Sequence, residues 1–270
     1  MICFPNAKIN LGLVVTDKRP DGYHSIESVF YPIPLRDILE VVHTKGAFEI
    51  SYSGIPIAGN SDDNLCAKAF HLVQKNYKIP NVKAHLHKII PMGAGLGGGS
   101  ADGAFMINLL NDFFELNISI EDRKKLDEQL GSDCPFFIEN KPCFVTGRGE
   151  NLETIPLNLK NYLVLIYPNL HMSTKEAYAG IIPEKSKQNM KNIIINSPTN
   201  QWKGLIKNQF EINVFKRFSI LNEIKSELYS NGAIYASMTG SGTTVYGLFE
   251  SKPDLQKTAF DTYFKWESWI

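Results

Sequence analysis

Apolar and polar residues alternate along several short stretches of the first half of the chain, which is the pattern of strands with one buried face. In the first of these, Lys8 and Asn10 fall on one face and Ala7, Ile9 and Leu11 on the other. Similar stretches predict further strands. The expected strands of this half are Phe4–Val15, Tyr23–Phe30, Asp37–His43, Ala47–Tyr52 and Asn81–Ile90. Strands with one wet face favour mixed or antiparallel sheets over a doubly wound parallel sheet.

Apolar residues at helical spacing predict helices between and after these strands. Asn64 is the expected N-cap of the first helix. The other expected helices are Ala101–Leu116, Ile120–Leu130, Thr174–Gly180, Lys207–Phe215, Ser219–Asn231 and a closing helix over Leu255–Trp266. Apolar runs predict strands at Tyr162–Tyr167 and Val245–Phe249, and Pro183–Asn200 is expected to be an exposed connection. The pattern predicts an α+β protein of two domains, 1–155 and 156–270, with the boundary after the turn at Gly147–Gly149.

The most distinctive stretch is Pro91–Asp102, PMGAGLGGGSAD, where glycines crowd a loop directly before a predicted helix. Such a loop presents unpaired N–H groups at the positive end of a helix dipole, and this combination binds phosphate. Residues 93–98 also satisfy GxGxxG, the dinucleotide fingerprint, but the preceding strand has a wet face rather than two buried ones. The Walker A pattern is absent. A flexible loop without a ligand is the plainer alternative.

Charge and cysteine content exclude several classes. The chain has 28 basic and 28 acidic residues, so no net positive charge recruits nucleic acid or an anionic membrane. The sequence contains no apolar run of about 18 residues, and its first residues do not have the pattern of a signal peptide. The four cysteines show no CxxC spacing. We therefore expect a cytoplasmic protein with reduced thiols and neither a zinc site nor disulfides.

Other residues carry candidate chemistry, and each has a plainer interpretation beside it. Asp133 follows Gly131 and Ser132, where an aspartate is commonly a turn residue or a helix N-cap. Lys8 could be a surface lysine on an edge strand. Tyr23 and His24 could be aromatic residues beside a turn, and Tyr178 could belong to the core. A second glycine loop, Met238–Thr243, could be a hairpin.

Residues 91–104, PMGAGLGGGSADGA, resemble the central motif of the GHMP kinases, a family of small-molecule kinases. Three further blocks, in the expected order, resemble the branch of this family that acts on 4-diphosphocytidyl-2-C-methyl-D-erythritol. They are residues 6–24 (NAKINL and RPDGYH), 130–135 (LGSDCP) and 238–242 (MTGSG). The resemblance implies an N-terminal ribosomal-protein-S5-like α/β domain and a C-terminal ferredoxin-like α+β domain. Its alternatives are another GHMP kinase of mevalonate or homoserine type, a non-catalytic nucleotide-binding module and a dinucleotide-dependent oxidoreductase.

The resemblance also implies roles for residues. Asp133 would be the catalytic base and Lys8 the cation beside it, in a reaction that transfers phosphate from ATP. ATP would be bound by Pro91, Met92, Gly93, Ala94, Gly95, Leu96, Gly97, Gly98, Gly99, Ser100 and Ala101. The cytidyl substrate would be bound by Asn10, Tyr23, His24, Tyr178, Thr239, Gly240, Ser241 and Gly242.

One departure concerns the metal. Mg²⁺ should accompany ATP, but many family members have two serines where this chain has Gly98 and Gly99. The metal ligands therefore stay open. The expected partner is a small molecule with a cytidine diphosphate group, with no nucleic acid or membrane involved, and the expected state is a monomer or weak homodimer.

Overall fold

The computed structural model describes residues 1–57, 60, 63–184, 189–255 and 260–270. The chain divides into two compact units built from interleaved segments. The first unit comprises 1–7, 35–92 and 97–141, and the second comprises 8–34, 93–96 and 142–270. The predicted domain division at residues 155 and 156 stays a prediction.

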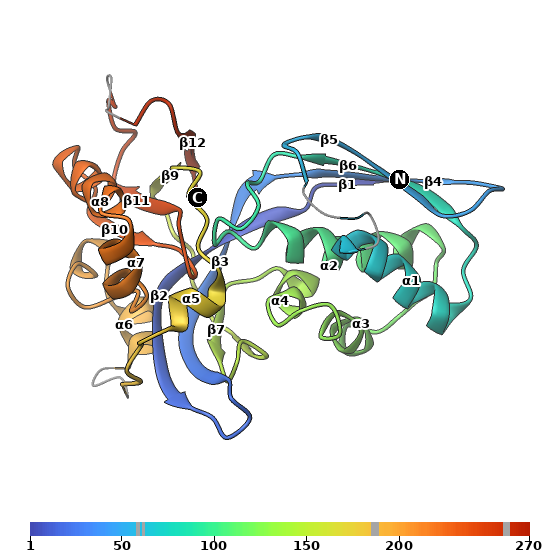
Figure 1. Cartoon of the computed structure of the whole chain (residues 1–270), viewed down its shortest axis with the longest axis horizontal. Helices are drawn as coiled ribbons and strands as arrows, with labels where there is room; N and C mark the ends of the chain where they lie inside the picture. The colour runs from blue at the N-terminus through green and yellow to red at the C-terminus, as the bar shows by residue number, and fades with distance from the viewer. Residues whose placement is uncertain (58–59, 61–62, 185–188, 256–259) are drawn as a thin grey trace. The chain divides into compact units, whose positions relative to one another are not determined.

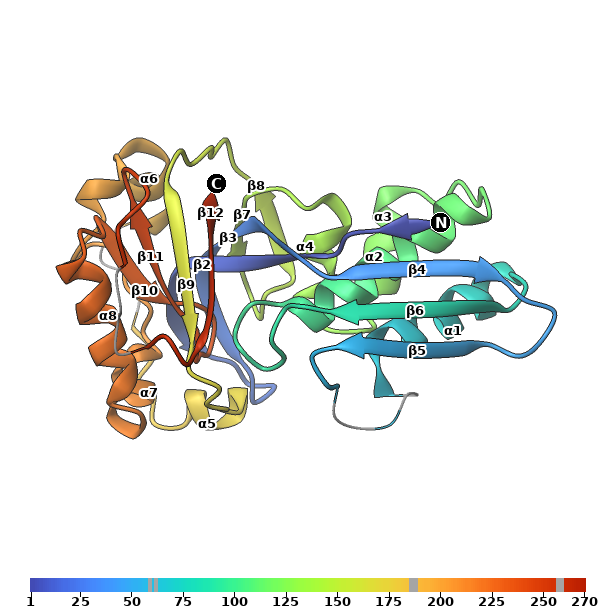
Figure 2. The ribbon, with the colours of Figure 1, turned by 90° about the horizontal axis from the view of Figure 1, so that it is seen from above.

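The first unit contains a mixed sheet with helices along one face (Figures 1 and 2). The strand order is β1 (Ile2–Cys3), β4 (Ile38–His43), β6 (Val82–Lys88) and β5 (Glu49–Gly54). β6 pairs antiparallel with β4 and parallel with β5, which confirms the expectation of a mixed sheet. The helices of this unit are α1 (Leu65–Tyr77), α2 (Gly98–Phe113), α3 (Ile120–Asp127) and α4 (Cys134–Glu139).

Local signals explain where these helices begin. Asn64 caps α1, as predicted, and its side chain accepts a hydrogen bond from the Cys66 amide. Ser119 caps α3 in the same way, through the Asp122 amide. Helix α2 begins three residues earlier than predicted, because Gly97 adopts the left-handed conformation (φ 72°) and the helix starts within the glycine run.

The second unit contains two sheets. One has the order β2 (Asn6–Lys18), β3 (His24–Arg36), β7 (Cys143–Thr146) and β8 (Asn151–Thr154), and the outermost ends of β2 and β3, Asn6–Ala7 and Leu35–Arg36, belong to the first unit. The other is antiparallel, with the order β10 (Tyr235–Met238), β11 (Val245–Phe249), β9 (Tyr162–Tyr167) and β12 (Phe264–Trp269).

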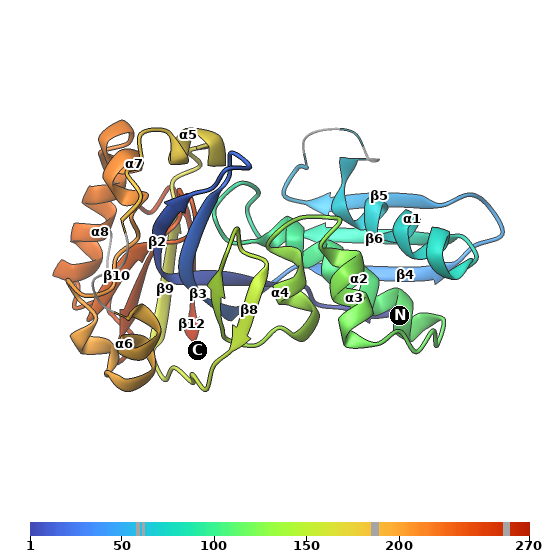
Figure 3. The same ribbon diagram turned by 90° about the horizontal axis from the view of Figure 1, so that it is seen from below.

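Helices pack on one face of this second sheet (Figure 3). α8 (Ile220–Ser230) contacts β10 and β11, and α7 (Glu211–Arg217) contacts α8. Their buried residues Val214, Leu221, Ile224 and Leu228 join Val164 and Val245 from the sheet in one core. The unit also contains α5 (Thr174–Tyr178), α6 (Met190–Asn196) and a short 3₁₀ helix at Thr199–Gln201.

Two expectations about secondary structure are wrong. The closing helix is not formed at its C-terminal end, because β12 pairs along the whole of β9, with Phe264 opposite Tyr167 and Trp269 opposite Tyr162. Residues 256–259 of that prediction lie outside the described residues. The segment 183–200 contains α6, whose Met190 and Ile194 are buried, while its residues 185–188 also lie outside the described part of the chain. No helix among the described residues is long and apolar enough to span a membrane.

Candidate active site

Strand β2 places two of the predicted site residues side by side in the interior of the second unit. Lys8 Nζ donates to Asn10 Oδ1 at 2.7 Å, the contact expected of residues i and i+2 on one strand face. Both side chains are buried, and Lys8 Nζ also lies 4.3 Å from the centre of the Phe30 ring. A surface lysine does not fit this position, because burying an ammonium group is costly unless other groups compensate it.

The second glycine loop meets the first loop next to this pair. Thr239 Oγ1 accepts from the Asn10 amide at 3.0 Å and donates to the Gly95 carbonyl at 3.1 Å. The Asn10 carbonyl accepts from the Tyr246 hydroxyl at 2.8 Å. The Lys8 amide donates to the Leu96 carbonyl at 2.9 Å. Residues 93–96 are therefore bound to both β2 and the second loop, which the sequence alone could not show.

Gly95 shows why this approach requires glycine. Its φ is +79°, and a Cβ at this position would lie 2.2 Å from the Thr239 carbonyl oxygen. Any other residue would both strain the backbone and separate the two loops. Gly240 and Gly242, which are predicted to bind the substrate with Ser241 between them, also have positive φ. The second loop is thus a compact turn between β10 and β11 whose polar side chain, Thr239, points to the first loop's backbone.

In the first unit, the other end of the first glycine loop forms the start of α2. Gly98, Gly99 and Ser100 are the first helical residues, and no side chain caps the helix at Gly97. The first N–H groups of a helix have no acceptor within it, so this end offers donors and a positive dipole for an anion. The arrangement fits the phosphate-binding role predicted for residues 91–101, which stays a prediction.

A buried ionic cluster lies beneath this helix start, and the sequence analysis did not identify it. Lys88 Nζ lies 2.5 Å from Asp37 Oδ2 and 2.6 Å from Asp102 Oδ2, and all three side chains are buried. The alternation held the signal, because Lys88 shares the face of Val82, Ala84 and Leu86, which is the buried one.

Electrostatics in this cluster follow from burial and from the pairing. Burial raises the pKa of Asp102 to about 8, and Lys88 opposes the shift. Burial would lower the pKa of Lys88, but the carboxylates of Asp102 and Asp37 raise it above its usual value. Asp102 would repel a phosphate at the helix start if no cation stood beside it. Lys88 is that cation.

Asp133, the predicted base, lies half-buried at the N-cap position of α4 in the first unit. It therefore occupies the position of the plainer interpretation, a helix N-cap, although its side chain makes no capping hydrogen bond. The helix forms because Pro135 suits a first turn and Phe136, Phe137 and Ile138 are buried. Lys8 belongs to the other unit, and joint action of Lys8 and Asp133 stays a prediction.

The predicted base-binding aromatics all belong to the second unit. His24 and Tyr178 stack on each other, with ring centres 4.8 Å apart and planes 17° apart. Tyr178 also packs edge-on against Phe210, so it combines a core contact with a ring face that His24 covers. Tyr23 is 58% exposed, and the Arg148 guanidinium lies over its ring at 5.1 Å. The structure brings His24 and Tyr178 together and leaves Tyr23 open to solvent.

A metal site is not preassembled among these residues. In the described part of the chain, no group of three or more His, Cys, Asp or Glu side chains could hold an ion. Gly98 and Gly99 lie in the first turn of α2 and bring no ligand, in line with the departure noted in the sequence.

Comparison with known proteins identifies the same family in both halves of the chain. The model of the GHMP kinases N-terminal domain matches residues 64–141, and that of the GHMP kinases C-terminal domain matches residues 188–263. A protein of Bacteroides thetaiotaomicron named 4-diphosphocytidyl-2-C-methyl-D-erythritol kinase is 48% identical over 266 residues, covering 97% of each chain. A similarly named protein of Cytophaga hutchinsonii is 45% identical, covering 94% of each.

Among solved structures, a 4-(cytidine 5'-diphospho)-2C-methyl-D-erythritol kinase matches with a TM-score of 0.79 and 29% identity, covering 92% of this chain and 90% of the other.

Proposed function

The chain belongs to the GHMP kinase family, and we propose that it transfers the γ-phosphoryl group of ATP to the 2-hydroxyl of 4-diphosphocytidyl-2-C-methyl-D-erythritol in the non-mevalonate isoprenoid pathway. The observation that carries the proposal is the 48% identity, over 97% of both chains, to a kinase named for that substrate.

Lys8 supplies positive charge to the reaction in this proposal. Its ammonium group is held by Asn10 Oδ1 and by the face of Phe30, so its position is set before any substrate arrives. A preorganised cation stabilises the charge that develops on a transferring phosphoryl group more than water does, because it needs no reorganisation. The negative charge of ATP also explains why a buried ammonium is useful here.

Asp133 orients the acceptor hydroxyl and takes its proton as the bond to phosphorus forms. A carboxylate suits this role because it can accept a hydrogen bond from the hydroxyl and then the proton. Its half-buried position at the start of α4 supports this assignment. No covalent enzyme intermediate is expected, since positioning and charge account for catalysis in this class of reaction.

The cytosine ring is bound by the aromatic group in the second unit. Tyr23 offers an exposed ring face, and His24 offers ring nitrogens to the edge of the base. Tyr178 supplies the second stacking surface once the base replaces the ring that now covers it. Base–aromatic stacking contributes about 1–3 kcal/mol per base. Mevalonate and homoserine carry no base, so these aromatics favour the cytidyl substrate.

ATP binds at the first glycine loop, residues 91–101, through backbone N–H groups at the start of α2. The described residues offer no preformed cage for a metal, which fits Mg²⁺ carried in on the phosphates rather than held by the protein alone. Mg²⁺ would neutralise part of the phosphate charge. The residues Thr239–Gly242 add backbone donors near the substrate's diphosphate.

We also infer the partner, the location and the oligomeric state of the enzyme. The partner is a small molecule, with neither nucleic acid nor membrane involved, in keeping with the balance of 28 basic and 28 acidic residues. We infer a cytoplasmic enzyme that acts as a monomer or weak homodimer.

ADP release tests the proposal, measured with ATP and equal concentrations of the cytidyl substrate, mevalonate and homoserine. We expect turnover with the cytidyl substrate alone. Turnover with mevalonate or homoserine but not with the cytidyl substrate would refute the specific assignment. The rate of ADP release without any acceptor is the background, and it is subtracted from each rate.

A further inference from the structure

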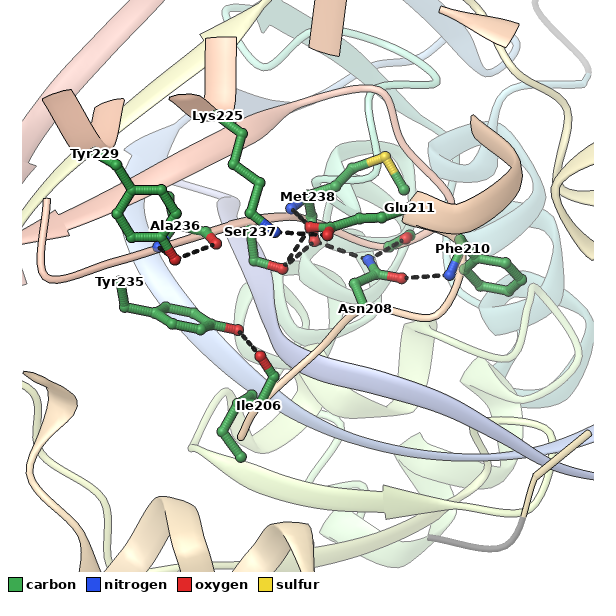
Figure 4. Close-up of polar contacts among 11 residues, drawn as sticks. Ile206, Asn208, Phe210, Glu211, Lys225, Tyr229, Tyr235, Ala236, Ser237 and Met238 are labelled. Carbon is green, nitrogen blue, oxygen red and sulfur yellow. Dashed lines mark hydrogen bonds and ion pairs between the residues drawn. The ribbon is translucent and has the colours of Figure 1, made fainter. Parts of the chain in front are cut away.

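The side chain of Asn208 is buried and makes three hydrogen bonds, each to a backbone group. It lies two residues before Phe210, which precedes α7, and it is 2% exposed. Its Nδ2 donates to the carbonyls of Met238 and Gly240, both at 2.8 Å, and its Oδ1 accepts from the Phe210 amide at 3.0 Å (Figure 4). Both hydrogens of the amide are thus used on the second glycine loop.

The two carbonyls that Asn208 holds lie on either side of Thr239. Thr239 is fully buried, and its hydroxyl joins the Asn10 amide to the Gly95 carbonyl. Rotation of the Met238–Thr239 peptide group, whose carbonyl Asn208 holds, would move this hydroxyl. Asn208 therefore fixes the residue through which the second loop contacts both β2 and the first loop.

Glu211 binds the same end of β10, through the amide of Met238 and the hydroxyl of Ser237. Its Oε1 accepts from the Met238 amide at 2.8 Å and from Ser237 Oγ at 3.1 Å, and its Oε2 lies 2.6 Å from Lys225 Nζ (Figure 4). Asn208 and Glu211 thus bind the carbonyl and the amide of Met238. Met238, the first residue of the second loop, is therefore fixed at its carbonyl and at its amide.

We propose that Asn208 is a positioning residue for phosphoryl transfer, which acts through Thr239 on Asn10 and Lys8. The path consists of contacts in one unit: Asn208 to the peptide groups around Thr239, Thr239 to the Asn10 backbone, and Asn10 Oδ1 to Lys8 Nζ at 2.7 Å. Small displacements of a positioned group can cost about 100-fold in rate. The inference rests on the proposed function, because it assigns Asn208 to that reaction.

Asn161 provides a matched control. It is also a buried asparagine of the second unit, 6% exposed, and its Nδ2 donates to the Phe249 carbonyl at 3.3 Å. Phe249 ends β11 at the strand end opposite Val245, which pairs with Met238 beside the loop. Loss of either asparagine removes buried hydrogen bonds to backbone, but only loss of Asn208 frees the second loop.

The first experiment compares Asn208→Ala, Asn208→Asp and Asn161→Ala in steady-state kinetics and thermal unfolding. We expect Asn208→Ala to lower kcat by about 10–100-fold, whereas Asn161→Ala, which also loses a buried hydrogen bond to backbone, changes it less than threefold. Asn208→Asp keeps the size and the acceptor for the Phe210 amide but turns an oxygen towards two carbonyls. A protonated carboxyl can donate one bond, so the kcat of this variant relative to wild type should recover as pH falls. Values of kcat within threefold of the Asn161 control for both variants would overturn the proposal.

A double-mutant cycle with Thr239→Val tests the path itself. If Asn208 acts through Thr239, the double variant should lose no more activity than the worse single variant, because the shared contact is already gone. Losses that multiply would contradict the path. Wild-type turnover is measured first: its absence with the cytidyl substrate contradicts the proposed function, and the same cycle is then run with the family acceptor that the enzyme does use.

Discussion

Lys88 and Asp37 form a fully buried ion pair, 2.5 Å between Nζ and Oδ2, where β6 ends and the first glycine loop begins. Asp37 Oδ1 also accepts from the amides of Ile89 (2.5 Å) and Ile90 (2.8 Å). Through Asp102, Lys88 reaches α2 as well. The ion pair therefore ties together the two elements that the first glycine loop connects.

Loss of the lysine from this cluster should be strongly destabilising. Lys88→Met leaves two buried carboxylates without their cation, and breaking a buried pair in this way costs about 3–5 kcal/mol. We expect a loss of that size in the free energy of unfolding, measured by urea denaturation. Lys83→Met is the control on the same strand, because Lys83 pairs with Glu49 at 3.0 Å on the exposed face. Exposed pairs contribute about 0–1 kcal/mol. Equal losses for the two variants would show that the cluster does not stabilise the fold.

Gly95→Ala should separate the two glycine loops. The substitution combines a positive φ with a Cβ 2.2 Å from the Thr239 carbonyl oxygen. Gly204→Ala is the control, since Gly204 has φ +82° but open space around its Cβ position. Strain alone costs about 1–2 kcal/mol. We expect a larger loss of stability for Gly95→Ala together with weaker ATP binding in calorimetry, and unchanged ATP binding for the control. The same stability and the same ATP affinity in both variants would contradict the close approach of the loops.

Regular patterns in the chain predicted most of the elements around the site. The alternation in β2 and β6 and the cap at Asn64 correspond to the observed strands and helix, but the wet face expected for β2 is wrong, because both of its faces are buried from Asn6 to Leu13. These signals are local, since they depend on side-chain spacing and on one capping residue. The α+β character follows from them. The contacts between the two glycine loops do not, because residues 95 and 239 are brought together only by the tertiary fold.

The wrong predictions also concern residues whose structure depends on contacts made by the tertiary fold. The segment ending at Trp266 was predicted to be a helix, but pairing with the wholly buried β9 selects a strand. The strand before the first glycine loop was expected to have a wet face, but Lys88 at its end lies inside with two aspartates. The alternation of the strand places Lys88 on the buried face, but its partners, 51 and 14 residues away in the chain, are brought to it only by the tertiary fold.

Asp127 should make stability depend on pH. It is fully buried in α3, neither of its carboxylate oxygens has a hydrogen-bond partner among the described residues, and burial raises its pKa to about 8. The unfolded chain loses this proton near pH 4, so between about pH 4 and pH 8 the folded state holds one proton more. Its contribution to stability therefore falls as pH rises through this window.

Asp127→Asn removes that titration. We expect the variant to gain stability over wild type by about 1.4 kcal/mol per pH unit across the window, measured by denaturation at several pH values. Asp122→Asn on the same helix should behave oppositely, because hydrogen bonds from Lys125 and Ser119 lower the pKa of Asp122. The ionised Asp122 carboxylate stabilises the folded state at neutral pH, and this contribution is lost as pH falls below 4. A pH-independent difference for Asp127→Asn would disprove the buried, protonated carboxyl.

Tyr23→Ala should weaken binding of the cytidyl substrate. Its ring is 58% exposed, so the substitution should leave Tm almost unchanged. Loss of a stacking contact of about 1–3 kcal/mol corresponds to a rise in KM of roughly 5–150-fold. Tyr77→Ala, an exposed tyrosine at the end of α1, serves as the control for removal of a surface ring. An unchanged KM for the cytidyl substrate would exclude the stacking role of Tyr23.

Asp133→Asn tests the catalytic base. The amide cannot take the proton of the acceptor hydroxyl, so kcat should fall by about 10²–10⁴-fold. Stability should change little, because asparagine is as good as aspartate at an N-cap. ATP binding, measured by calorimetry without acceptor, should stay within about threefold of wild type.

Asp112→Asn is the control for that variant, since it makes the same change of charge at an exposed position near the end of α2. Its kcat should equal that of wild type. The decisive comparison is between the two variants at saturating substrate. A base that acts in the chemical step changes kcat, whereas a residue that only shapes the α4 start would change Tm and KM. Full turnover by Asp133→Asn would therefore remove Asp133 from the mechanism and leave Lys8 as the charged residue to be tested next.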